Sequence, residues 1–144
     1  MLARLIEALA PYLSQTQCDV ALDQIDPTAG FLGSCVRALA SLAPYLNAAQ
    51  LGRAFELLVQ LQEEDGFEYG LFDADQALCA RLLALPLQPA MAIWQAALPG
   101  FAQQPRRLFV QHAFRFADLF ERLGGRGTVE RFVRDLTEAF ERWR

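Results

Sequence analysis

The sequence predicts an all-α protein of stacked antiparallel helical hairpins that ends in a capping helix. Apolar residues recur at helical spacing, as Leu51, Phe55 and Leu58 do, and no stretch alternates strictly at period two. The phrase ALAPYL at residues 8–13 returns as SLAPYL at residues 41–46, an offset of 33. With 144 residues and 53% apolar composition, the chain has the size and core content of one domain.

Eight helices are expected, each separated from the next by residues that end helices. Ser14, Asn47 and Thr128 stand where N-caps belong, because their side chains can accept a hydrogen bond from a free backbone N–H. The Pro99-Gly100 pair is expected to end the sixth helix, and the seventh is expected to run unbroken. The predicted helices are 2–12, 15–25, 29–44, 48–63, 70–85, 89–98, 105–123 and 128–143.

The repeat extends beyond the shared phrase. Each unit is a helix that closes near a proline, then a polar cap, then a second amphipathic helix. One such hairpin cannot bury its own apolar faces, so neighbouring hairpins must cover them, as in an α-solenoid of the HEAT or tetratricopeptide type. Small residues such as Gly52 are expected to let helices approach closely. Further matches at the offset of 33 are Arg4 with Arg37, Gln17 with Gln50, Ala21 with Ala54, and Ile25 with Leu58.

The repeat divides the chain into units within a single domain, 1–144. The units are about 1–26, 27–65 and 66–104, followed by a cap at 105–144. The last helix fits the end of a stack, because it has a single apolar stripe and one charged side for water.

Several residue types are missing, and their absence excludes classes of enzyme. All 13 basic residues are arginine, so a P-loop lysine and a Schiff-base lysine are excluded for this chain. His112 is the single histidine, so a histidine-rich metal site is excluded. The three cysteines form no CxxC pair, which favours a reduced, cytoplasmic protein. No apolar run is long enough for a membrane span, and no cofactor or metal is expected.

The expectation is therefore a module without catalysis of its own. The alternative from another class is a small cytosolic hydrolase in which His112 and a cysteine act together. Cys18, Cys35 and Cys79 fall at apolar helical positions, which favours small buried core residues over nucleophiles. His112 is expected to be a hydrogen-bonded residue at the core boundary.

Two regions could bind a partner. Phe67, Tyr69 and Phe72 are interleaved with an acidic cluster, and such an edge could dock a basic protein segment. The cluster lacks the residue order of an EF-hand and is expected to be solvated. Its members are Glu63, Glu64, Asp65, Glu68, Asp73 and Asp75.

The second region is the basic end of the chain. Arg107, Arg115 and Arg122 share the polar side of one predicted helix, which allows an anion- or nucleic-acid-binding alternative. Interspersed acids and a net charge of −4 argue against nucleic acid. Phe114 lies off the apolar face of the same helix; burial under a neighbouring helix is the favoured interpretation, and an exposed anchor for a partner is the alternative.

The phrase ALAPYL and the basic end together resemble the helical-repeat arrays and C-terminal caps of bacterial STAND (NACHT-like) ATPases. The features shared with those caps are Trp94-Gln95 with Leu98, then Arg106, Arg107 and Leu108, then Leu123-Gly124-Gly125, and finally Arg142-Trp143.

The chain also departs from that pattern. Ala117-Asp118 replaces an Ala-Pro pair, Arg144 stands where a second tryptophan is usual, and residues 63–76 lengthen the second unit. Nothing in the chain resembles the ATPase domain. The resemblance implies a bacterial ligand-sensing repeat surface whose partner is another protein or a linked or associated ATPase–effector domain.

Overall fold

The computed structural model describes residues 2–28, 32–61, 68–104, 106–125 and 127–142. Within these ranges the chain is all-α and has no strand, as predicted. None of the helices in the described ranges is long and apolar enough to cross a bilayer. The helices are α1 (Leu2–Leu9), η1 (Ala10–Tyr12), α2 (Gln15–Asp23), α3 (Leu32–Leu42), η2 (Ala43–Tyr45), α4 (Ala48–Gln60), α5 (Glu68–Ala84), α6 (Leu87–Ala102), α7 (Arg106–Arg115), α8 (Ala117–Gly124) and α9 (Thr128–Arg142).

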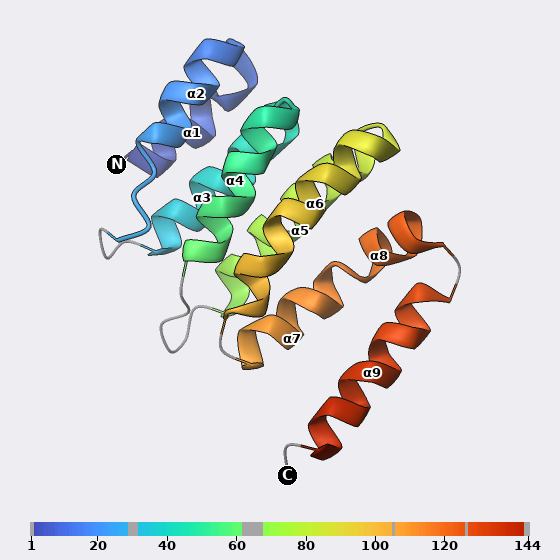
Figure 1. Ribbon diagram of the computed structural model, residues 1–144. Helices are drawn as coiled ribbons and strands as arrows, with labels where there is room; N and C mark the ends of the chain where they lie inside the picture. Colours follow the sequence, from blue (N-terminus) through green and yellow to red (C-terminus); the bar gives the residue numbers. More distant parts are fainter. Residues whose placement is uncertain (1, 29–31, 62–67, 105, 126, 143–144) are drawn as a thin grey trace.

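The first six α-helices form two layers. In one layer α1 packs against α3 and α3 against α5, and in the other α2 packs against α4 and α4 against α6. Figure 1 shows these helices as three neighbouring pairs, with α7, α8 and α9 following at one end of the row. Helices α7 and α8 pack against α5, and α9 packs against α8.

The repeated phrase folds the same way twice. Pro11 and Pro44 each lie in the first turn of a short 3-10 helix. A backbone N–H has no partner within the helix at such a position, so proline loses no hydrogen bond there. The following Leu13 and Leu46 are extended, with ψ of 136° and 138°, and turn the chain into the second helix. The first hairpin is defined as α1, η1 and α2, and the second hairpin as α3, η2 and α4.

Each second helix begins with a capping box. The Ser14 hydroxyl accepts a hydrogen bond from the backbone N–H of Gln17, whose side chain accepts one from the Ser14 N–H. Asn47 and Gln50 form the same pair of bonds at the start of α4. Two N–H groups that the helix leaves unpaired are thereby satisfied at each start, which confirms these two predicted caps.

Side chains also tie the hairpins to one another. The Gln50 Nε2 atom donates to the Gln15 carbonyl at 2.7 Å and to Asp19 Oδ1 at 3.1 Å. The Arg53 guanidinium pairs with Asp19 at 3.6 Å and with Asp23. From the next helix, the Nε of Arg81 donates to the carbonyl of Leu46 at 2.8 Å.

An aromatic cluster fills the core where α4, α6 and the start of α8 meet. The ring of Phe55 is fully buried and lies 6.4 Å from Trp94, 6.4 Å from Phe101 and 5.8 Å from Phe116, measured between centroids. Trp94 and Phe116 are 5.1 Å apart. These tilted and edge-on arrangements are the favourable ones for aromatic pairs.

Three expectations about helix ends are wrong. Helix α6 continues through Pro99 to Ala102, because Pro99 and Gln95 are both exposed and water can satisfy the carbonyl that proline leaves unbonded. The single helix expected at 105–123 is broken at Phe116, where φ is −93° and ψ is 13°. Thr128 is the first residue of α9, and its hydroxyl is buried without a hydrogen-bond partner rather than serving as the cap.

The close helix approach also occurs at a different glycine from the one expected. A Cβ added at Gly52 in α4 would meet nothing within 4 Å, whereas one at Gly100 in α6 would lie 2.7 Å from Cγ1 of Val59. Gly100 therefore lets α6 lie close against α4.

The same substitution at these two glycines is expected to have opposite effects. Gly52→Ala should raise the free energy of unfolding by about 0.5 to 1 kcal/mol, because alanine restricts the unfolded chain and favours helix. Gly100→Ala should lower it by about 1 kcal/mol, because overpacking against the stiff Val59 side chain outweighs that gain. Urea denaturation followed by circular dichroism measures both, and a stabilised Gly100→Ala variant would contradict the close approach.

Candidate interaction site

The most polar part of the core joins α5 to α7. Asp75 is 0% exposed and His112 is 2% exposed, although both types of side chain usually lie at the surface. The His112 Nδ1 donates to Asp75 Oδ2 at 2.9 Å, and Nη1 of Arg115 donates to the same oxygen at 2.9 Å. Asp75 was expected to be solvated with the rest of the acidic cluster, and that expectation is wrong. The residue is buried because α7 supplies two hydrogen-bond partners for its carboxylate.

His112 also packs against aromatic rings. Its ring is stacked on Phe116, with centroids 6.2 Å apart and planes 14° from parallel, and it lies 5.1 Å from Phe101. Two polar atoms of the group, Asp75 Oδ1 and His112 Nε2, have no hydrogen-bond partner. His112 is therefore more deeply buried than the boundary position expected from the sequence.

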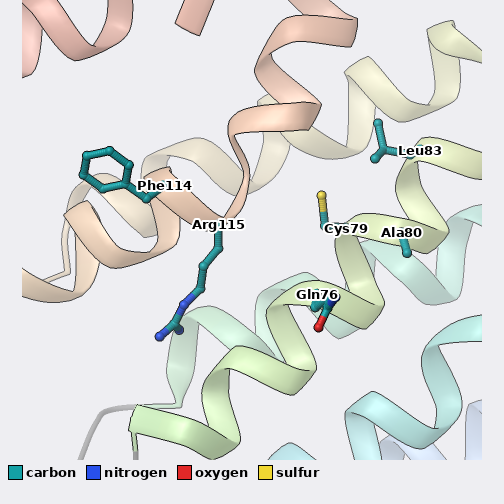
Figure 2. Close-up of a pocket in the computed structure, with 6 residues that line it drawn as sticks. All are labelled: Gln76, Cys79, Ala80, Leu83, Phe114 and Arg115. Carbon is teal, nitrogen blue, oxygen red and sulfur yellow. The ribbon is translucent and has the colours of Figure 1, made fainter.

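A groove lies beside this polar group, between α5 and α7. Its volume is about 460 Å³ and it is open to solvent. Figure 2 shows the Cys79 thiol and Gln76 on α5, with the Arg115 side chain extending from α7 to one side of them. The lining residues are mostly apolar: Gln76, Cys79, Ala80, Leu83, Phe114 and Arg115.

Helix α5 builds one wall through its helical spacing. Gln76, Ala80 and Leu83 are four and three residues apart and share one face. Cys79 lines the groove beside them, and Asp75 is fully buried. The sequence reasoning missed this wall. A usable signal exists: Asp75 interrupts the otherwise apolar buried positions Ala74, Leu78, Cys79 and Leu82.

Phe114 is the exposed aromatic residue of the groove. It is 61% exposed, so the favoured interpretation of burial is wrong. The cause is its position on α7: His112 and Phe116 lie one turn apart on the face that packs inward, and Phe114 is halfway between them, on the opposite face. An exposed phenyl ring beside an apolar groove is the kind of residue that dominates protein interfaces.

Two arginines of the basic end, Arg115 and Arg122, bind groups of α5 and of the residues that follow it. Arg115 is 16% exposed in its side chain and pairs with Asp75. Arg122 donates to the carbonyls of Leu83 and, at 2.6 Å, Leu85, where α5 ends and its last carbonyls have no helical partner. Both guanidinium groups thus tie α7 and α8 to α5.

The remaining candidate residues lie partly outside the described structure. Phe67 is outside the described residues. Tyr69 and Phe72 belong to α5 and Arg107 to α7, but their side chains are outside the described part of the structure. The structure therefore does not describe the acidic–aromatic edge as a surface.

The cysteine chemistry of the site is set by burial. All three cysteines are free and buried, as expected of core residues. Burial raises the pKa of Cys18 and of Cys35, and it raises the pKa of Cys79 to about 11, with Asp118 and Asp75 adding to the shift. A thiol with such a pKa stays protonated at neutral pH, and the protonated form is a poor nucleophile and a poor metal ligand.

Metal binding finds no support in the described side chains. Among them, no three His, Cys, Asp or Glu residues come together as a set that could hold a metal ion.

Comparison with known proteins adds no assignment. The chain matches no protein-family model, no curated protein and no solved structure.

Proposed function

We propose that the chain is a protein-interaction module that binds a short apolar segment of a partner in the groove between α5 and α7. The observation that carries the proposal is Phe114, a phenyl ring exposed to 61% at the margin of an apolar groove. Aromatic side chains are enriched at the surfaces where protein partners meet, and they often carry much of the binding energy there.

The buried polar group supports this proposal by fixing the walls of the groove. Asp75 on α5 holds His112 and Arg115 on α7, so the distance between the two helices is set by hydrogen bonds of 2.9 Å. A preformed groove loses less conformational freedom when a partner binds, which increases affinity for a given contact area.

We further propose that the paired helices form an α-solenoid and that the chain serves as the sensor end of a bacterial STAND-like ATPase assembly in the cytoplasm. The repeated capping boxes and 3-10 turns support the repeat interpretation. The resemblance of the cap motifs supports the assembly, whose ATPase and effector domains would be carried elsewhere. Immunoblotting of host lysate for a band far above 16.1 kDa tests it.

The Cys–His hydrolase remains the alternative from another class. The protonated, buried thiols weigh against it, because an attacking cysteine needs thiolate character. Turnover of a p-nitrophenyl ester that is lost in a folded Cys79→Ala variant would favour it. For the anion- or nucleic-acid-binding alternative, retention on heparin with a steep salt dependence is the discriminating result.

The groove proposal predicts a specific loss of peptide binding in the Phe114→Ala variant. Random peptides displayed on phage and selected on the native chain should contain an apolar anchor residue. Their affinity for Phe114→Ala should be about thirtyfold weaker, since a hot-spot residue contributes about 2 kcal/mol. Isothermal titration calorimetry with synthetic peptides measures the difference.

The matched control is Val133→Ala, which removes an exposed apolar side chain from α9. Its peptide affinity should stay within about twofold of the native chain, because surface substitutions away from a site have small effects. Peptides that bind Phe114→Ala as tightly as the native chain would contradict the groove as the binding site, and so would a selection that enriches no peptide.

A further inference from the structure

The outer face of the first hairpin carries an exposed apolar stripe. Leu5 is 55% exposed and Tyr12 is 82% exposed. The part of this stripe that belongs to α1 lies about 100° around the helix from Ala3 and Ile6, which are buried. Its residues, all large and apolar, are Leu2, Leu5, Leu9, Tyr12 and Val20.

The second hairpin shows what such positions do when a hairpin precedes them. Adding the offset of 33 to Leu2, Leu5 and Leu9 gives Cys35, Ala38 and Leu42, and these three residues are buried. Ala3 and Ile6 are buried in the first hairpin, and their equivalents Val36 and Leu39 are buried in the second. The two helices differ in one neighbour: α3 has a preceding first helix, α1, packed against it. Leu2, Leu5 and Leu9 therefore occupy positions that a preceding hairpin covers, whereas Tyr45, the equivalent of Tyr12, stays 38% exposed.

The polar contacts between the hairpins repeat this relation. Gln50 uses its Oε1 for its own capping box and its Nε2 to reach the carbonyl of Gln15 in the preceding hairpin. Gln17 is the equivalent of Gln50 in the first hairpin and makes the same capping box. The Nε2 atom of Gln17 is therefore the equivalent of the atom with which Gln50 donates to a preceding hairpin. Arg53 reaches the preceding hairpin's Asp19, whereas its equivalent is the apolar Val20.

We propose that the outer face of the first hairpin is a docking surface for one further helical hairpin of the same build, placed as the first hairpin is placed on the second. Its first helix would present apolar residues at the positions equivalent to Ala3, Ile6 and Ala10. The start of its second helix would offer a backbone carbonyl to Gln17, and an apolar side chain rather than a carboxylate would face Val20. This surface lies on α1 and α2, so it is independent of the groove between α5 and α7.

The test adds such a hairpin to the complete chain. A second copy of residues 1–33 is placed directly before Met1, which keeps the spacing of 33 between equivalent positions. Leu5→Cys, in the original hairpin, reports whether the stripe is covered, through its rate of reaction with a fluorescent maleimide located by mass spectrometry. The native thiols are buried and contribute little background.

Arg4→Cys in the original hairpin is the matched control. Arg4 is exposed, and its equivalent Arg37 is exposed although a hairpin precedes it. Cysteine at position 4 should therefore react equally fast with and without the added hairpin. Cysteine at position 5 should react about tenfold or more slowly in the extended chain, because reaction then requires local opening. The extended chain should also unfold at higher urea concentration, since each docked neighbour adds an interface.

Equal labelling of position 5 in both chains would overturn the proposal, as would an extended chain that unfolds earlier or does not fold. Protection of position 5 in the unextended chain that grows with protein concentration would also overturn it. That result would identify a second copy of the chain as the occupant of the stripe.

Discussion

Replacing Asp75 with asparagine is expected to lower the free energy of unfolding by about 3 to 5 kcal/mol. The carboxylate is completely buried and accepts hydrogen bonds from His112 and Arg115 through the same oxygen. An amide has the same shape but no charge, so the ion pair between Asp75 and the Arg115 guanidinium is lost. Removing the charge of one partner in a buried ion pair is strongly destabilising.

Asp73→Asn is the matched control for this measurement. Asp73 lies two residues earlier on the same helix and is exposed, so the same chemical change should alter stability by less than about 0.5 kcal/mol. Urea denaturation followed by circular dichroism gives both values. A loss below about 1 kcal/mol for Asp75→Asn would show that the buried group does not hold α5 and α7 together.

Truncating Phe55 to alanine is expected to destabilise the protein by about 3 to 5 kcal/mol. Its ring is fully buried and lies within 6.4 Å of the centroids of Trp94, Phe101 and Phe116. Alanine would lose the transfer free energy of the phenyl ring and leave a cavity between α4, α6 and the start of α8. Tryptophan fluorescence should change as well, because Trp94 would lose one of its packing partners.

Phe114→Ala is the control, because it makes the same truncation at a ring that is 61% exposed. Its stability should change by less than about 0.5 kcal/mol. Equal losses for the two variants would mean that Phe114 is packed in solution, which would remove the basis of the groove proposal. The comparison thus tests the core and the proposed binding surface together.

The sequence predicts those structural features correctly whose interacting residues lie within a few positions of one another. The N-caps Ser14 and Asn47 are examples, since each side chain accepts from a backbone N–H three positions further along the chain. The cysteines at apolar helical positions were also predicted correctly to be buried. Such features depend on one helix and the start of its neighbour, so helical spacing is sufficient to find them.

The errors came from residues whose role depends on a distant helix. Asp75 reads as one more acid of a charged segment, and only the approach of α7 supplies its two donors. The break at Phe116 contains no glycine or proline, so the local sequence gives no signal for it. Both Phe116 and Leu119 are buried around this break. Phe114 is exposed because this packing fixes which face of α7 turns inward.

The ties between hairpins also bear on how the chain finds its fold. The side-chain hydrogen bonds that join neighbouring hairpins, and those that join α7 and α8 to α5, link residues between 30 and 45 positions apart. The entropy lost in closing a loop grows only with the logarithm of its length, by about 0.6 kcal/mol per doubling, so each docking step closes a loop at nearly the same entropy loss. No step has to wait for two distant ends of the chain to meet. Helices α1 and α9 lie at opposite ends of the row of helices (Figure 1), so a force applied between Leu2 and Arg142 would load the hairpin interfaces one after another.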